Sequence, residues 1–474
     1  MSFQDVFTRE IPFEWFVVTV IGFIVRTDIN GVTSFVRALR FASTRAYKAM
    51  IHFFRSNAWT LEKLRNRWIK IVRESGFIHM EDGHPVIVGD HTDAPKEATR
   101  MPGVKKIHQE SEDSSKPETI RGHAFGCVGV LLGNGIKTFC TPLSMLVHDG
   151  VKPMLEYKKS VYAEESMLSR LAREACEVAI AFDQACYLLM DRAFLTVNVL
   201  TAINEEIKKA ARPLITLITR PKSNYVGWFP SDMPACGGAP ADKKKIRIMS
   251  LFEKAADQFI TAQAIIYQQT ETVRYYCVNL LWGRDLYQEI RFVLVDSDAF
   301  KGILACTDLT LDPVRIIELY CLRFKIESCF RAFKLTLGGF GYHFWTHRMP
   351  VFSQYATVEA MSKKVEDAGS FCMGHIVSTL DAIEGFVMIA CIALGILQLV
   401  SLSCPAEINK NENYWLRTYS NEMPSEETTK INIQYSVFSI LHKCPYLGLV
   451  KAINARRRAT GVAVEDSVFE SDVA

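Results

Sequence analysis

The sequence predicts an α/β fold with a mixed β-sheet, and three patterns support this prediction. Short apolar runs bounded by turn residues indicate β-strands at 85–90, 122–133, 138–147, 185–191 and 213–220, with a glycine turn at 133–135. Helical periodicity alternates with the later strands, at 163–182 and 197–211. Helical patterns also precede the first strand, at 31–41, 44–55 and 59–75. Three antiparallel strands followed by alternating helices and strands indicate a mixed sheet with helices on both faces.

This order of elements matches a ribonuclease-H-like core, which we expect to be extended by other regions. Residues 230–245 are rich in Pro and Gly, and the runs that follow alternate as β-strands. We interpret 221–300 as an inserted β-rich subdomain. The predicted regions are a helical N-terminal DNA-binding region at 1–80, the first part of the catalytic core at 81–220, the insertion at 221–300, the completion of the core with the helix of 312–338 at 301–350, and a helical C-terminal region at 351–474 with a disordered tail beyond 457.

Composition excludes several classes of protein. With 474 residues, 49% of them hydrophobic, the chain can form two or three well-packed domains. The 13 cysteines include no CxxC motif and no Cys/His group with zinc-ligand spacing, which favours reduced thiols in the cytoplasm. The net charge is only +3, so any basic nucleic-acid-binding surface must be local.

Two apolar stretches raise the question of a membrane span. Residues 13–25 contain Glu14 and are too short to cross a bilayer. Residues 385–402 are long enough, but no second span matches them and no basic flank adjoins them. We therefore expect a buried helix of a soluble core and no membrane association.

A basic helix is predicted at 59–75, with two tryptophans between its cations. The cations are Lys63, Arg65, Arg67, Lys70 and Arg73, and the tryptophans are Trp59 and Trp68. DNA contact is the functional interpretation, and a solvated helix face is the alternative.

The helix predicted between Asp312 and Gly338 carries an unusual polar stripe. Tyr320, Arg323, Glu327 and Lys334 fall within about 60° of one another at 100° per residue. A hydroxyl, two cations and a carboxylate on one face suit a site for a divalent metal and phosphates. The alternative is that Arg323 and Glu327 form an ordinary i,i+4 surface pair worth about 0.3–0.5 kcal/mol.

Asp90 and Asp191 each end a predicted apolar strand, where open α/β sheets bind ligands. Together with Glu327 they would supply enough oxygens for two Mg²⁺ or Mn²⁺ ions about 3.5–4 Å apart. Each aspartate taken alone could be a turn or cap residue. Asp93 and Asp308 are competing candidates. We prefer Asp90 to Asp93, which would point differently from the strand axis and adjoins a Pro-containing loop, and we interpret Asp308 as a turn residue before the helix. His91 and His123 could join the site, although a single histidine is more often structural.

These motifs resemble a known family. The spacing Tyr320-x2-Arg323-x3-Glu327-x6-Lys334 is similar to the Y-(2)-R-(3)-E-(6)-K signature of bacterial insertion-sequence transposases of family four. The segments CTDLTL before the signature and YHFW after it also resemble that family. The segments VGDHTD and MDRAF resemble its two aspartate motifs, and the similarity covers roughly residues 30–405.

The resemblance implies a DDE transposase with a ribonuclease-H-like core and a β-rich insertion. It implies that Asp90, Asp191 and Glu327 are the catalytic, metal-binding acids. It further implies that Tyr320, Arg323 and Lys334 hold terminal DNA phosphates, and that an aromatic residue of the insertion traps a flipped base. Trp228 and Trp282 are the candidates for that role, with packing as the alternative for each.

The expected activity is metal-dependent strand cleavage and strand transfer at the terminal inverted repeats of an insertion sequence. The expected partners are the double-stranded DNA of the element ends and of the target, and a second copy of the chain in a synaptic homodimer. Two alternatives remain open, namely a non-catalytic DNA-binding descendant and a metal-dependent nuclease without strand transfer.

Overall fold

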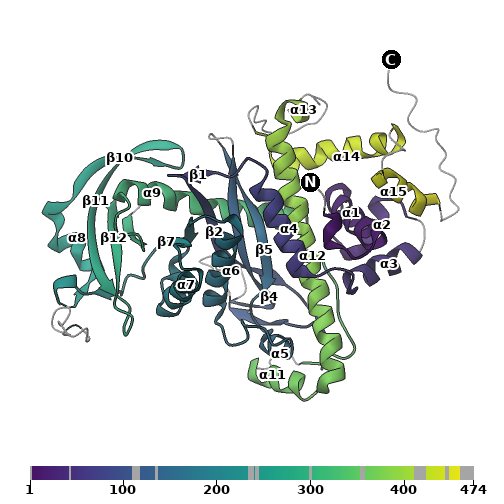
Figure 1. Cartoon of the computed structure of the whole chain (residues 1–474), viewed down its shortest axis with the longest axis horizontal. Coiled ribbons are helices and arrows are strands. Elements are labelled where there is room, and N and C mark those ends of the chain that lie inside the picture. The colour runs from purple at the N-terminus through teal and green to yellow at the C-terminus, as the bar shows by residue number, and fades with distance from the viewer. Residues whose placement is uncertain are drawn as a thin grey trace. The chain divides into compact units, whose positions relative to one another are not determined.

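A computed structural model gives the fold, and it divides into two compact units (Figure 1). The helical unit comprises Met1–Trp68, Glu97–Val104 and Arg331–Ala474, and the sheet unit comprises Ile69–Lys96 and Lys105–Phe330. The residues that the structure describes are 3–41, 44–108, 118–133, 137–232, 240, 245–297, 301–352, 358–409, 423–443 and 448–458. The tail predicted beyond 457 and the turn predicted at 133–135 therefore lie largely outside the described residues.

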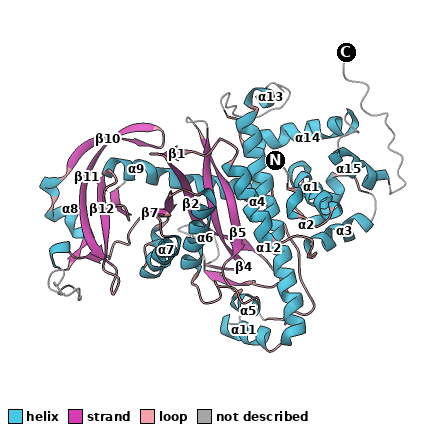
Figure 2. Cartoon of the chain, viewed as in Figure 1, coloured by secondary structure: helices cyan, strands magenta, loops and turns pink. Residues whose placement is uncertain are grey.

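The sheet unit contains one large mixed sheet, drawn in magenta in Figure 2. Its strands are β1 (Met80–Glu81), β2 (His84–Pro95), β3 (Lys105–His108), β4 (Thr119–Gly133), β5 (Thr138–Val147), β6 (Cys186–Met190), β7 (Ile215–Thr219), β10 (Ile260–Ile266), β11 (Gln269–Trp282), β12 (Gln288–Asp296) and β13 (Lys301–Cys306). The order is β10-β11-β12-β13-β7-β6-β2-β4-β3, with β1 paired to β2 and β5 paired to β4. The predicted mixed α/β architecture is confirmed.

Parallel pairing is confined to the centre of this sheet. β6 pairs in parallel with β2 on one side and with β7 on the other. The remaining pairs are antiparallel, including β2 with β4 and β4 with β5. All five residues of β6 are buried, as expected for a central strand covered on both faces.

Most strands of residues 221–300, the predicted β-rich insertion, extend the main sheet. β10, β11 and β12 continue the main sheet, since β12 pairs with β13 and β13 pairs with β7. Among the described strands of this region, only β8 (Val226–Gly227) and β9 (Ile246–Arg247) form a sheet of their own. The long antiparallel register of β11 with β12 provides the backbone hydrogen bonds that make this extension possible.

Helices connect and cover the strands of the sheet unit. They are α5 (Lys152–Tyr157), α6 (Met167–Phe182), α7 (Val197–Ala210), α8 (Leu251–Lys254), α9 (Pro313–Cys321) and α10 (Lys325–Arg331, up to Phe330). Ser166 caps α6 by accepting from the Ser169 amide, and Thr196 caps α7 by accepting from the Val199 amide. α6 packs on β2 and β4, so it lies behind the strand that carries Asp90.

The helical unit is built around one long helix. Its elements are α1 (Glu10–Val25), α2 (Gly31–Ala38), α3 (Thr44–Phe54), α4 (Leu61–Arg73, up to Trp68), α11 (Val358–Glu366), α12 (Gly369–Ser403), α13 (Pro405–Asn409), α14 (Glu426–Lys443) and α15 (Gly448–Arg458). Short 3₁₀ turns among the described residues include Gln4–Val6, Arg192–Phe194, Pro230–Asp232, Ile248–Ser250, Ala256–Gln258 and Leu322–Phe324.

α12 contains the apolar stretch predicted as a core helix. Among the described residues it is the one helix whose length and composition would allow a membrane crossing, yet 83% of its most apolar window is buried inside the protein. Phe23, Phe35 and Phe54 pack around its Phe386, with ring centroids 4.9, 5.8 and 5.7 Å away. These contacts are those of a core helix, as the sequence predicts.

The tryptophans of the predicted basic helix belong to the core of the helical unit. Trp68 is fully buried in α4, and Trp59 stacks on Phe53 at 5.4 Å. Trp59 also lies so close to α12 that a Cβ at Gly385 would be 2.6 Å from its ring. The interleaved aromatic rings therefore stabilise packing and are not presented on a surface.

Candidate active site

Asp90 and Asp191 lie at the edge where two adjacent parallel strands stop pairing. The last paired residues of β2 and β6 are Gly89 and Met190, and the aspartates follow them directly. β6 ends there, whereas β2 continues to Pro95 because its other side stays paired with β4. The prediction that the strand ends at Asp90 is therefore wrong, although the two aspartates do share one edge of the parallel part of the sheet.

The signature segment is not one regular helix. The α9 helix begins at an Asp312 cap, whose carboxylate accepts from the Val314 and Arg315 amides. A 3₁₀ turn at Leu322–Phe324 separates α9 from α10, and a π-helical turn at Ala332–Thr336 follows. Tyr320, Arg323 and Glu327 thus belong to the sheet unit.

Lys334 lies in the π-helical turn, which belongs to the helical unit. Its ammonium nitrogen is 6.0 Å from the centre of the Phe340 ring. The acids and Lys334 are in different units, so the site described below is that of the sheet unit alone.

Arg323 joins the signature helix to the sheet edge. Its Nη1 donates to Asp90 Oδ2 at 3.0 Å, and its Nη2 donates to Glu327 Oε1 at 3.4 Å. The Arg323 and Asp90 side chains are each 19% exposed, and Glu327 is 47% exposed. Arg323 therefore does more than form the i,i+4 surface pair, because it also binds a carboxylate 233 residues away in the chain.

Asp90 is an unfavourable place for a negative charge. Burial raises its pKa to about 6; the Arg323 guanidinium and the His91 amide oppose this, and the Glu327 and Asp191 carboxylates raise the pKa further. The His91 amide donates to Asp90 Oδ1 at 2.8 Å. The Glu327 and Asp191 carboxylates are therefore close enough to act electrostatically on Asp90, and Arg323 opposes their effect.

Tyr320 shares this electrostatic environment. Burial raises its pKa to about 12, with Asp191 and Asp90 acting in the same direction and Arg323 and Arg220 in the opposite one. Its hydroxyl consequently stays protonated at neutral pH and can donate a hydrogen bond. Arg220 was missed by the sequence analysis, although its position directly after the third parallel strand, β7, was a usable signal.

Asp191 is fixed by its own backbone neighbours. Its carboxylate accepts from the Arg192 amide at 2.6 Å and caps the 3₁₀ turn Arg192–Phe194. Its carbonyl oxygen accepts from Thr219 Oγ1 at 2.7 Å, which ties the end of β6 to the end of β7. The alternative role as a cap residue is therefore real, and it leaves Asp191 Oδ2 available for other partners.

The competing aspartate Asp308 is a turn residue, as predicted. Its Oδ1 accepts from the Thr310 amide at 2.8 Å and from the Thr310 hydroxyl at 2.7 Å. Asp93 lies further along β2, opposite Ala124 of β4, within the antiparallel pairing that β6 does not share. Neither residue displaces Asp90 from the candidate site.

A chain of buried polar side chains lies behind Asp90, and no sequence motif marks it. It runs from His91 through His148 and Glu174 to Arg170. Burial lowers the pKa of His91 to about 3, and it also lowers the pKa of His148. The Glu174 carboxylate opposes both of these shifts. Both rings are therefore neutral at pH 7. His123, the other histidine considered, is fully buried and makes an edge contact with Phe125.

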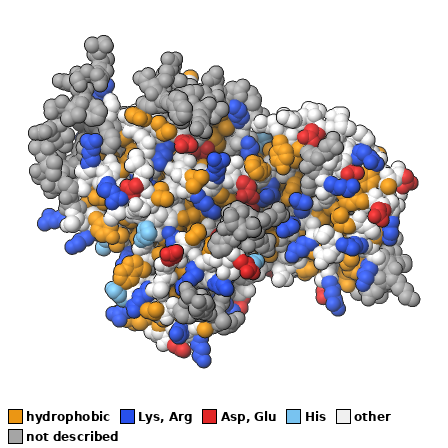
Figure 3. Space-filling view, turned by 180° about the vertical axis from the view of Figure 1, so that it is seen from behind, with side chains coloured by type: hydrophobic (Ala, Val, Ile, Leu, Met, Phe, Trp, Pro, Cys, Tyr) orange, Lys and Arg blue, Asp and Glu red, His pale blue; other side chains and the backbone are white. Residues whose placement is uncertain are grey.

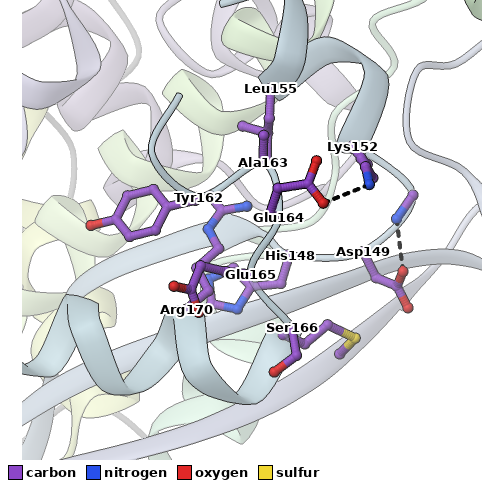
Figure 4. Close-up of a pocket in the computed structure, with 12 residues that line it drawn as sticks. His148, Asp149, Lys152, Leu155, Tyr162, Ala163, Glu164, Glu165, Ser166 and Arg170 are labelled. Carbon is purple, nitrogen blue, oxygen red and sulfur yellow. Dashed lines mark hydrogen bonds and ion pairs between the residues drawn. The ribbon is translucent and has the colours of Figure 1, made fainter. Parts of the chain in front are cut away.

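A cavity of about 330 Å³ adjoins the far end of this chain (Figure 4). His148 and Arg170 line it together with residues of 149–167, including Lys152, whose ammonium donates to Glu164 at 2.9 Å. None of the predicted acids lines this cavity. The cavity and the candidate site are therefore separate features that share one buried chain.

The donor set at the sheet edge suits Mg²⁺ or Mn²⁺. No group of three or more His, Cys, Asp or Glu side chains placed to hold a metal ion occurs in the described part of the chain. Carboxylate oxygens are nevertheless the ligands these ions prefer, and a divalent cation would stabilise the charged form of Asp90, whose pKa is raised first by burial and then by the Glu327 and Asp191 carboxylates. Arg323 at present donates to two of the three carboxylates.

The two candidate aromatic residues of the insertion are packed inside the protein. Trp282 is 7% exposed and lies 5.1 Å from the Tyr225 ring. Trp228 is 8% exposed and makes an edge contact with Tyr287 at 5.5 Å. In this arrangement neither indole is presented for stacking on a base.

Comparison with known proteins gives no relative: no protein family, no curated protein and no solved structure matches the chain. Any functional conclusion therefore depends on the signature residues and on the geometry described above.

Proposed function

We propose that the chain is a DDE transposase with a ribonuclease-H-like core, which cleaves DNA strands and transfers them at the ends of an insertion sequence. The observation that carries the proposal is the meeting of three separate segments at one sheet edge. Asp90 and Asp191 follow the last paired residues of β2 and β6, and Arg323 binds Asp90 from the helix that carries Glu327.

The strand order of the sheet supports the proposed core. Through the pairs β5–β4, β4–β2, β2–β6 and β6–β7, the strands lie in the order third, second, first, fourth and fifth along the chain. The first three are antiparallel and the last two run parallel to the first, as a ribonuclease-H-like sheet requires. The signature helix then follows β13, after the strands that extend the sheet.

The acids would hold the metal, and the cations would hold the DNA. Asp90, Asp191 and Glu327 would bind Mg²⁺ or Mn²⁺, which when bound lower the pKa of water or of a 3′-hydroxyl and stabilise the leaving oxygen. Arg323 offers a bidentate fork to a phosphate once it leaves Asp90, and the protonated Tyr320 hydroxyl donates a further hydrogen bond. Arg220 is a second guanidinium close enough to act on Tyr320. The role of Lys334 in phosphate binding comes from the signature alone.

Cleavage requires no covalent intermediate with the protein. Hydrolysis of one strand at each element end frees a 3′-hydroxyl, which then attacks the opposite strand or the target DNA. Holding a phosphodiester against three carboxylates calls for cations, and Arg323 already binds two of these carboxylates, those of Asp90 and Glu327.

The proposed partners are double-stranded DNA and a second copy of the chain. A homodimer would pair the two element ends in the cytoplasm, so that two sites act on two ends. Lys and Arg side chains are spread among Asp and Glu on the face drawn in Figure 3, in keeping with 55 basic and 52 acidic residues overall. DNA would therefore be held by local groups of cations and not by the net charge.

A supercoiled donor plasmid carrying the inverted repeats that flank the reading frame tests the proposal. Excision and insertion in the presence of Mg²⁺ would support a transposase. Nicking alone would indicate a nuclease without strand transfer, and a mobility shift without cutting would indicate a DNA-binding protein without activity.

Asp191→Ala is the matched variant for this assay. It should abolish cleavage while leaving binding to the element ends largely intact, because Asp191 would bind metal and not DNA. Cleavage that persists in Asp191→Ala would refute the site assignment, whichever reaction the wild-type protein carries out.

A further inference from the structure

The residue that follows Asp90 is anchored by a continuous hydrogen-bonded chain. His91 Nε2 lies 3.1 Å from His148 Nδ1, and His148 Nε2 lies 3.0 Å from Glu174 Oε1. Arg170 Nε donates to the same Glu174 oxygen at 3.2 Å, and its Nη1 donates to the Val147 carbonyl at 3.0 Å. The chain therefore runs from β2 to α6 and ends on the backbone of β5.

Because the side chains of this hydrogen-bonded chain are buried, losing one of its hydrogen bonds would destabilise the fold. The His148 and Glu174 side chains are completely buried, and Arg170 is 5% exposed. A buried polar group destabilises the fold when its hydrogen-bond partner is lost, whereas an apolar residue would fill the same space without that penalty. A fully connected buried network fixes the orientation of its members more narrowly than apolar packing does.

The chain also fixes which ring nitrogens carry protons. The Glu174 carboxylate only accepts, so the neutral His148 ring donates from Nε2 and accepts at Nδ1. The His91 ring must then donate from Nε2 to His148. His91 is thereby held in one tautomer and one ring orientation.

His91 contacts both aspartate segments. Its amide donates to Asp90 Oδ1 at 2.8 Å. Its ring lies parallel to the Phe194 ring, with 3° between the planes and 5.5 Å between the centroids. Phe194 belongs to the 3₁₀ turn that Asp191 caps, so His91 contacts the Asp90 carboxylate through its backbone amide and the Asp191 segment through its ring.

The opposite strand leaves room for this arrangement. Gly126 of β4 pairs with His91, and a Cβ at Gly126 would lie 2.0 Å from the His148 ring. Glycine at this position lets His148 lie against the strand and reach His91.

We propose that His91, held by His148, Glu174 and Arg170, is a positioning residue that sets Asp90 and Asp191 for joint metal binding. The proposal rests on the proposed function. It assigns His91 no contact with metal or DNA, and it requires that loss of its side-chain hydrogen bond loosens both aspartates together.

The test is the Mn²⁺ affinity of the full-length protein, measured by calorimetric titration without DNA. His91→Phe keeps a ring against Phe194 but removes the hydrogen bond to His148, and it should weaken Mn²⁺ binding about 10- to 100-fold, the usual effect of losing an outer-sphere partner. His91→Gln can still donate to His148 and should recover much of that loss. His123→Phe, which alters a buried histidine outside the chain, should bind Mn²⁺ like the wild type.

Thermal melts establish that each variant is folded at the temperature of titration. If His91→Phe does not fold, His91→Asn serves in its place, because its shorter amide cannot reach His148. Wild-type Mn²⁺ affinity in a folded His91→Phe or His91→Asn protein would overturn the proposal. If instead the wild type binds no Mn²⁺, or Asp191→Asn binds it equally well, the proposed function itself fails.

Discussion

Asp90→Asn should stabilise the metal-free protein, and the gain should depend on pH. Burial raises the Asp90 pKa from 3.8 to about 6. The folded chain therefore holds the proton more tightly than the unfolded chain, and wild-type stability falls as the pH rises from about 4 through 6. Asparagine has the same shape, is never charged, and avoids that loss.

The size of the effect follows from the shift. About two pKa units correspond to about 3 kcal/mol, so Asp90→Asn should be more stable than wild type by about 3 kcal/mol at pH 8. The difference should shrink to about 1.5 kcal/mol at pH 5 and about 0.5 kcal/mol at pH 4, as the folded-state carboxyl becomes protonated.

Urea denaturation in EDTA at these three pH values, followed by circular dichroism, measures the difference. Asp308→Asn is a control whose stability should change in the opposite direction. Burial raises the pKa of Asp308, but the Thr310 hydrogen bonds lower it below its usual value. Loss of the Asp308 charge should therefore destabilise the protein at pH 8. Equal stability of Asp90→Asn and wild type at pH 8, or a gain that does not shrink at low pH, would refute the view that Asp90 holds an unfavourable charge.

Three further predictions concern single side chains. Arg323→Gln should raise Mn²⁺ affinity about tenfold in calorimetric titration, because it frees Asp90 and Glu327 from a competing cation; weaker Mn²⁺ binding would contradict this competition. Leu189→Ala, at a fully buried position of β6, should lower the free energy of unfolding of the sheet unit by about 2–5 kcal/mol in urea denaturation, and a loss below about 1 kcal/mol would show that β6 is not central to the core. Arg26→Met should destabilise the helical unit by about 2–4 kcal/mol, because it leaves the buried Leu337 and Gly338 carbonyls without their donor; an unchanged melting temperature would argue against that role.

The sequence predicts which segments form strands of the sheet better than it predicts where each strand ends. Apolar runs locate β2, β4, β5, β6 and β7, because burial on both faces demands continuous hydrophobic residues. The run that contains Asp90 becomes polar at that residue, which suggested a strand end. Pairing with β4 overrides this local pattern and carries β2 on to Pro95.

The connection of β10, β11 and β12 to the main sheet could not be read from the sequence either. Alternation of apolar and polar residues shows that a segment is a strand, but not which strand lies beside it. The pairing of β13 with β7, over only two residue pairs, decides that the sheet continues.

Some features of the candidate site can likewise be predicted from the sequence, and others cannot. Helical spacing correctly places Arg323 beside Glu327, since four residues make about one turn. It does not predict the 3₁₀ and π-helical turns that interrupt the segment, nor the pairing of Arg323 with Asp90. His148 and Glu174 carry no local signal at all, because their relation to His91 exists only after β4, β5 and α6 have packed.

Cleavage of a labelled DNA duplex carrying one element end tests the central claim most directly. With Mg²⁺, the wild-type protein should release a strand with a free 3′-hydroxyl at the boundary of the element. Glu327→Gln should bind the same duplex with unchanged affinity and release no product. Cleavage by Glu327→Gln at the wild-type rate would contradict the assignment of Asp90, Asp191 and Glu327 as one metal-binding site.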